Sequence, residues 1–341
     1  KFERKFASYI KSKFAIGTGS ATQSLHLSLR SLDIGVGDEV IVPTFTFAST
    51  ANAVIYCGAK PIFADVDVDT FNINPKEIEK KITKKTKAVI IVHYGGQSCD
   101  MDEILLITKK HKIHLVEDCA HSLGSKYRNS FCGSLGITGN FSFYPTKIIT
   151  TGEGGMVTTR NQLVSKKIKL LRSQGMSIQA TEREKSSKWG YDIIDLGYNY
   201  RLDEIRSSLG FSQLNRIAQI NNSRKKIASK YDQKLKKFKG IITPSIKDNR
   251  NHIYHLYTIR ITEEYPLSRD ELYDKLSKNG IGSSVQYTPL HLMSYYSKKY
   301  HLNKKIFPNA NLLKNQVLSL PIFPQMTLKQ INYVISHICK N

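Results

Sequence analysis

The chain has 341 residues, of which 40% are hydrophobic and 23% charged, a composition typical of a soluble globular protein. A chain of this length is expected to form one sizeable domain and a smaller one. No stretch approaches the roughly 18 apolar residues that a membrane span needs, so we expect no membrane contact. The five cysteines are odd in number and lack CxxC spacing, which argues against a disulfide framework and fits a reducing cytoplasm.

The formal net charge of +23 raises the alternative of a nucleic-acid-binding protein. The lysines, however, are spread in pairs along expected helices, as at Lys80–Lys81 and Lys225–Lys226, without interleaved aromatic residues or a recognition motif. We therefore expect no nucleic-acid partner. A basic rim would instead attract an anionic substrate by long-range steering.

Near the start of the chain, SATQSLHLSLRSL places leucines at helical spacing, which predicts a helix beginning near Ser20 to Thr22. The start of such a helix offers free backbone N–H groups to an anion, although a simple N-cap is the plainer interpretation. Thr22 stands where the last glycine of a GxGxxG motif would be, so a dinucleotide-binding fold is not supported.

The next segments alternate strand, helix and strand, as in a parallel α/β sheet. Phe47 follows the first of these strands, at the edge where such sheets bind ligands, and core packing is the alternative for it. Further on, LVEDCAH is a buried strand that ends in Glu117 and Asp118. His111 with His114, or Glu117 with His121, lacks a third ligand at suitable spacing, so we expect no metal site.

The stretch FSFYPTKIITTGEGGM, residues 141 to 156, combines a hydroxyl at Ser142, an amine at Lys147 and a turn rich in glycine. Each feature alone is ordinary: a lysine is usually a solvated surface charge, and GEGG is usually only a turn. Together with Asp118 they supply what pyridoxal phosphate (PLP) requires. These are an amine for a Schiff base, a partner for the pyridinium nitrogen, and donors for the phosphate.

The order and spacing of these groups resemble the sugar-nucleotide aminotransferases of the DegT/DnrJ/EryC1/StrS family, over essentially the whole chain. The resemblance implies that Lys147 forms the Schiff base with PLP and that Asp118 pairs with the pyridine nitrogen. It also implies that Ser142, Ala21 and Thr22 bind the cofactor phosphate.

By the same resemblance, Phe47 stacks on the pyridine ring and His121 lies close to it. Asn199, within the Asn-Tyr-Arg sequence, reaches across a homodimer interface to the phosphate in the neighbouring subunit. Tyr287 and His291, in QYTPLH, resemble the segment that lines the sugar-nucleotide pocket, although a loop aromatic and a capping histidine are an equal alternative.

The implied fold is α/β, a fold type I PLP-dependent transferase with a mostly parallel, seven-stranded sheet. We expect a large PLP-binding domain at residues 1–238 and a smaller α+β domain at 239–341, because breakers cluster between Lys239 and Asn251. The family usually has a further helix and a glycine-bearing loop before residue 1. Asp203 is predicted to cap a long helix whose apolar face includes Ile205, Leu209 and Leu214. The only tryptophan, Trp189, falls in a polar loop before it.

The function implied is transfer of an amino group from L-glutamate to the ketone of a nucleotide-linked 4-keto-6-deoxy sugar or related sugar, for surface polysaccharide or glycoconjugate synthesis. The string KIITTGEGG together with His121 looks more like the C4 than the C3 aminotransferases. A C3 aminotransferase and a non-catalytic PLP-binding regulator remain the alternatives. A PLP-dependent sugar dehydratase is disfavoured, because there a histidine replaces the lysine found at Lys147.

Overall fold

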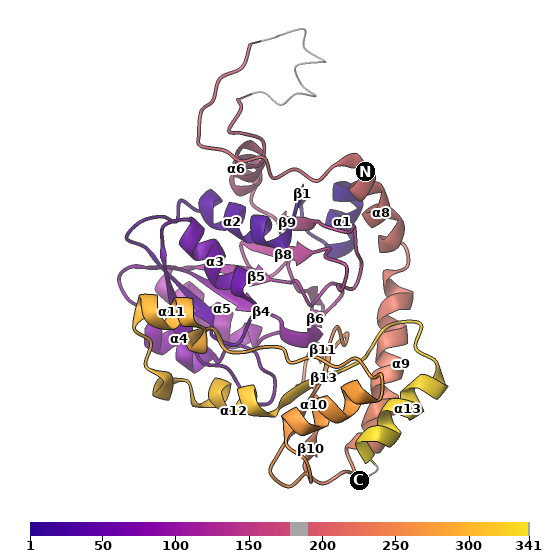
Figure 1. The fold of residues 1–341 in the computed structure, drawn as a ribbon. Helices are drawn as coiled ribbons and strands as arrows, with labels where there is room; N and C mark the ends of the chain where they lie inside the picture. Colours follow the sequence, from indigo (N-terminus) through magenta and orange to yellow (C-terminus); the bar gives the residue numbers. More distant parts are fainter. Residues whose placement is uncertain (178–189, 340–341) are drawn as a thin grey trace.

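The computed structural model describes residues 1–177 and 190–339, so Trp189 lies outside the described residues. A seven-stranded sheet forms the centre of the molecule (Figure 1). In spatial order its strands are β1 (Phe14–Thr18), β9 (Gly155–Thr159), β8 (Thr138–Ser142), β5 (His114–Asp118), β4 (Thr86–Val92), β2 (Glu39–Pro43) and β3 (Lys60–Ala64). Only β9 runs antiparallel to its neighbours in this sheet, which confirms the predicted mostly parallel, seven-stranded architecture.

The sheet is covered on both faces, which explains why its central strands are continuously apolar. In β4, Ala88 and Ile90 pack into one apolar cluster, whereas Val89 and Ile91 pack into another. Helices α2 (Ala21–Ser31), α3 (Ala48–Tyr56) and α6 (Gln162–Arg172) contribute to the clusters on the first face. Helices α1 (Phe2–Ile10), α4 (Pro75–Lys81) and α5 (Met101–His111) contribute to those on the second.

A second core belongs to the C-terminal part of the chain. It surrounds a three-stranded antiparallel sheet of β10 (Ile241–Ile242), β12 (Tyr257–Ile261) and β13 (Val317–Leu320). The long helix α9 (Ile217–Leu235), together with α10 (Arg269–Lys278) and α13 (Leu328–Cys339), packs around it. The boundary at residue 238/239 stays a prediction, with the C-terminal half of α9 packed on this second core.

Two segments tie the C-terminal part back to the large sheet. Helices α11 (Ser294–Tyr300) and α12 (Pro308–Gln316) contribute Tyr296 and Leu313 to the core beneath α3. A small sheet joins β11 (Arg250–Asn251) to the hairpin of β6 (Lys126–Tyr127) and β7 (Ser130–Phe131). The described residues also form 3-10 turns, η1 (Tyr94–Gly96), η2 (Leu290–Leu292) and η3 (Lys304–Ile306).

The helix predicted after Asp203 exists, but its apolar face differs from the expectation. Asp203 caps α8 (Glu204–Leu214) by accepting a hydrogen bond from the backbone of Arg206, and the chain turns before α9 begins. Of the expected apolar face only Leu214 is buried, whereas Ile205 is 85% and Leu209 45% exposed. Within the described residues, no helix has the length and apolarity to span a bilayer.

Candidate active site

The predicted site residues gather at the carboxyl edge of the parallel strands, where α/β sheets bind ligands. Phe47 follows β2, Asp118 ends β5, and Lys147 follows β8 by five residues. Adjacent strands hold these ends in register, because β5 pairs with both β4 and β8. The sheet therefore brings together side chains that are about a hundred residues apart in the sequence.

Lys147 lies in a loop held by several hydrogen bonds. Its backbone N–H donates to the carbonyl of Tyr144 over 2.9 Å, and the side chain of Gln213 bonds both the N–H and the carbonyl of Thr150. Burial lowers the pKa of the Lys147 amine from 10.5 to about 8, against the opposing effect of the Asp118 charge. About a tenth of this amine is therefore free, and nucleophilic, at pH 7.

Asp118 is a buried carboxylate with few partners. Its Oδ2 accepts a hydrogen bond from the hydroxyl of Thr50 over 3.0 Å, and its Oδ1 accepts one from the backbone of Ala120 over 3.1 Å. Burial raises its pKa above the usual range, while these two bonds and the charge of Lys147 act in the opposite direction. A buried carboxylate of this kind gains from a cationic partner, and a pyridinium nitrogen is such a partner.

Glu117, which precedes Asp118, is held by hydrogen bonds within the protein. Its two oxygens accept backbone hydrogen bonds from Gly133, Leu135 and Gly136 over 2.6 to 2.8 Å. A fourth bond of 3.0 Å joins Oε2 to Nε2 of His93, and both side chains are fully buried. These bonds anchor the loop before β8 to the end of β5 and leave Glu117 no role at the cofactor.

His93, Glu117 and Cys119 also offer three ligand atoms within 4.8 Å of one another. The nitrogens of His93 are already engaged, because Nδ1 accepts from the backbone of Cys99 over 3.1 Å and Nε2 bonds Glu117. A metal ion would have to replace these bonds, so we assign the group a packing role.

His121 and Tyr287 form one wall of the site. The backbone N–H of Gly95 donates to Nδ1 of His121 over 3.4 Å, so Nε2 carries the hydrogen and donates to the Tyr287 hydroxyl over 3.0 Å. The two rings are nearly parallel, at 13°. Burial holds the pKa of His121 well below its usual range, which keeps the ring neutral. Phe47, 60% exposed, lies beside Tyr287 with ring centroids 6.2 Å apart.

A candidate phosphate cradle lies where β1, β9 and β8 meet. Gly155 pairs with Thr18 on one side and with Ser142 on the other. A Cβ on Gly155 would lie 2.5 Å from the backbone of Ser20, so only glycine allows this approach. Ser20 caps α2 by accepting a hydrogen bond from the backbone N–H of Gln23 over 3.3 Å, whereas among the described residues the N–H groups of Ala21 and Thr22 have no partner.

The remaining predicted residues have contrasting surroundings. Asn199 is exposed and forms an isolated β-bridge with Ser173. His291 is completely buried, and its ring nitrogens bond the hydroxyl of Thr44 over 2.7 Å and Oδ1 of Asn311 over 2.9 Å. These contacts enclose the ring of His291 within the protein, whereas the hydroxyl of Tyr287 bonds His121. Contact of either residue with a substrate stays a prediction.

Two further residues at the site have no clear signal in the sequence. Thr50 is one helical turn after Phe47, and its contact with Asp118 depends on how α3 packs over the sheet. The ring of His255 lies 4.5 Å from that of His121, and its Nδ1 is buried without a hydrogen-bond partner among the described residues. Thr50 and His255 therefore lie next to the predicted residues Asp118 and His121.

Comparison with known families decides the class of the protein. The model of the DegT/DnrJ/EryC1/StrS aminotransferase family matches residues 1–339. The chain belongs to this family. It is therefore a PLP-dependent aminotransferase, as the arrangement of Lys147 and Asp118 had indicated.

Curated relatives match this aminotransferase over nearly its full length. An uncharacterized protein of Methanocaldococcus jannaschii, MJ1066, is 44% identical over 100% of this chain and 89% of its own length. The spore coat polysaccharide biosynthesis protein SpsC of Bacillus subtilis is 39% identical, over 99% and 88%. The GDP-perosamine synthase of Caulobacter vibrioides is 38% identical, over 98% and 88%.

Solved structures show the same fold. DesV of S. venezuelae superposes with a TM-score of 0.91 at 34% identity, covering 99% of this chain and 87% of that one. Spr1654 of Streptococcus pneumoniae, in its PLP form, superposes with a TM-score of 0.91 at 30% identity, covering 99% and 89%. The expected fold type I architecture is confirmed.

The chain's own residues fit PLP. Lys147 offers an amine of lowered pKa, Asp118 offers a buried carboxylate in need of a cation, and the start of α2 offers free N–H groups. When bound, the cofactor supplies an electron sink for the bonds at the carbon that carries the amine.

The state of Lys147 predicts how the cofactor-free protein takes up PLP at different pH values. Only the free amine reacts, so the rate of PLP binding should rise about tenfold per pH unit below pH 8 and level off above it. Because Asp118 raises the pKa of this lysine, Asp118→Asn should move the profile to lower pH. Stopped-flow absorbance after mixing with PLP measures the rate. A rise that continues to pH 10 would show an ordinary, solvated lysine.

Proposed function

We propose that this aminotransferase moves an amino group from L-glutamate to the C4 ketone of a nucleotide-linked 4-keto-6-deoxy sugar or a related keto sugar. The observation that carries the proposal is the meeting of Lys147 and Asp118, which perturb each other's pKa, beside the His121–Tyr287 wall. Two relatives are named for polysaccharide biosynthesis and for perosamine synthesis, which supports a sugar substrate. Five free cysteines fit action in a reducing cytoplasm.

In the proposed mechanism, Lys147 acts twice in each half of a ping-pong cycle. Its amine would hold PLP, and once the donor's amine had taken its place, the freed Lys147 amine would accept the proton of the donor's α carbon and later give it up again. Asp118 remains ionised and keeps the pyridine nitrogen protonated. The same lysine then works in the reverse direction when the sugar ketone receives the amine. The keto acid leaves in the first half, and the amino sugar leaves in the second.

The proposed site is shared between two copies of the chain. Asn199 is exposed, as a residue that reaches a neighbouring subunit must be. Large apolar side chains are exposed on the segment that leads to it and on α8, and among the described residues they have no cover: Ile193, Ile194, Leu196, Ile205 and Leu209. Contiguous exposed apolar residues typically mark a protein interface. We propose a homodimer formed over this surface, with Asn199 donating to the partner's cofactor phosphate.

For the acceptor, Tyr287 is the residue we place in the sugar pocket. Its ring lies between Phe47 and His121, whereas His291 is enclosed by protein partners. The preference for C4 over C3 rests on His121 and on the lysine motif KIITTGEGG. A C3 aminotransferase is the second candidate on the same chemistry.

A two-step assay tests this function. Purified protein with bound PLP should lose its visible absorbance on addition of L-glutamate. It should regain that absorbance on addition of a keto sugar nucleotide. We would offer UDP- and GDP-linked 4-keto- and 3-keto-6-deoxyhexoses, and locate the new carbon–nitrogen bond by NMR. Amine at C3 would move the assignment to the second candidate, and no response to any amino acid would favour a non-catalytic PLP-binding regulator.

A further inference from the structure

Arg224, on α9, is a buried cation with incomplete pairing. The residue is only 6% exposed, and burial lowers the pKa of its guanidinium to about 10, so it stays charged at neutral pH. Its Nη1 donates to the carbonyls of Tyr254, His255 and Ile322 over 2.9 to 3.2 Å. Among the described residues, Nε and Nη2 have no hydrogen-bond partner and no carboxylate pairs with the charge. Burying such a cation is costly unless an anion joins it.

This arginine lines a cleft of about 560 Å³ that also has Lys147 in its wall. The cleft lies between the loop around Lys147, the α8–α9 region and the segment after β13. Its basic residues are Lys147, Arg216 and Arg224, and its described lining includes no aspartate or glutamate. Amide and hydroxyl groups complete the polar wall, from Gln213, Gln219, Ser223 and Gln325 among others. A small anion is the ligand that this lining fits.

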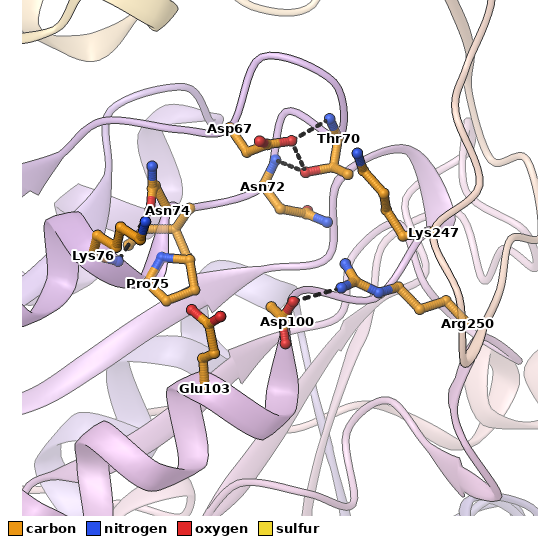
Figure 2. A pocket seen from close by; sticks show the side chains of 11 residues that line it. Asp67, Thr70, Asn72, Asn74, Pro75, Lys76, Asp100, Glu103, Lys247 and Arg250 are labelled. Atoms are coloured by element: carbon orange, nitrogen blue, oxygen red, sulfur yellow. Dashed lines mark hydrogen bonds and ion pairs between the residues drawn. The ribbon is translucent and has the colours of Figure 1, made fainter.

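A second polar pocket, of about 390 Å³, contains an arginine that has a carboxylate partner (Figure 2). There Arg250, whose side chain is 9% exposed, pairs with Asp100 over 2.8 Å and also bonds the carbonyl of Ser98. Lys247 pairs with Asp69, and Asp67 accepts three hydrogen bonds from its own turn. Arg250 and Lys247 therefore each have a carboxylate partner, in contrast to Arg224.

We infer that the Arg224 cleft binds a carboxylate group of the amino-acid donor, with Arg216 adding positive charge at its rim. The donor must bring its amine to the cofactor carbon to which Lys147 would be bonded. A carboxylate bound in the adjoining cleft would hold the donor in that position. The sugar acceptor has no carboxylate to place, and its proposed contact is Tyr287, on the side of His121. The inference rests on the proposed aminotransferase function. It assigns the amino-acid donor to Arg224 and the sugar acceptor to Tyr287.

The test compares the donor and acceptor half-reactions in Arg224→Gln, Arg224→Lys and Arg216→Gln, with Arg250→Gln as the matched control. Wild type must first respond to L-glutamate, and failure there would overturn the proposed function itself. For Arg224→Gln we expect the KM for L-glutamate to rise about tenfold or more, with partial recovery in Arg224→Lys. Arg216→Gln, a change at an exposed position, should raise the KM for L-glutamate less than Arg224→Gln does. Its effect should be larger at low salt than at high salt, because salt screens exposed charges.

Binding to the cofactor-free protein gives an independent readout. Calorimetry with glutarate, which has carboxylates but no amine, should show weaker binding in Arg224→Gln, whereas UDP and GDP should bind as in wild type. Arg250→Gln should lower the melting temperature without changing the KM for L-glutamate. A lower melting temperature with unchanged L-glutamate and glutarate binding would make Arg224 a structural tie. Weaker binding of UDP or GDP alone would assign the cleft to the nucleotide. Either result overturns the inference.

Discussion

Replacing Lys147 by alanine should abolish transamination, with turnover falling by about 10⁴-fold or more, because no other amine replaces it as the nucleophile and proton carrier. Among the described residues, it is the lysine whose charge acts on both Asp118 and His121. The fold should persist, because the change also removes the cost of burying the Lys147 cation, and Asp118 keeps its hydrogen bonds from Thr50 and Ala120. Turnover with L-glutamate and the acceptor identified by the screen, together with thermal unfolding, would measure both effects.

Lys166→Ala, at an exposed position on α6, serves as the control and should keep full activity. Retained PLP in Lys147→Ala, without the wild-type visible absorbance, would show that the pocket survives the change. Full turnover by Lys147→Ala in the absence of added amine would remove this residue from the mechanism.

Much of this site could be predicted because sequence patterns determine where strands end. Apolar runs such as that of β4 are buried on both faces and therefore require a covered parallel sheet. A parallel sheet then places Asp118 and the loop of Lys147 at one edge. The start of α2 followed similarly from its capping pattern, with Ser20 as the N-cap.

The sequence did not reveal residues whose role depends on packing between distant elements. Arg224 is one of 51 lysines and arginines, and its burial against the backbone carbonyls of residues 254, 255 and 322 becomes visible only in the structure. The exposure of the apolar face of α8 has a related physical reason. Helical periodicity shows that Ile205 and Leu209 need cover, but it does not show whether this chain or a second copy supplies it.

Mixing two inactive variants should restore activity if Asn199 acts across a dimer interface that includes the exposed face of α8. If Asn199 serves the partner's site, Lys147→Ala and Asn199→Ala damage different subunits of each active centre. A heterodimer then contains one site with both residues intact, whose lysine comes from the Asn199→Ala chain. In a random mixture about half the dimers are mixed, so about a quarter of wild-type activity should return from two nearly inactive parents.

Co-expressing the two variants with different affinity tags isolates the heterodimer, and its turnover is then compared with that of each parent homodimer. If Asn199 acts within its own subunit, every heterodimer has one site without the lysine and one without the asparagine. Its activity would then equal the mean of the parents. Gel filtration provides the second check, because a fully active monomer would exclude a shared site. Ile205→Lys places a charge on the exposed face of α8 and should dissociate the dimer. Loss of activity together with the dimer would show that this surface completes the site.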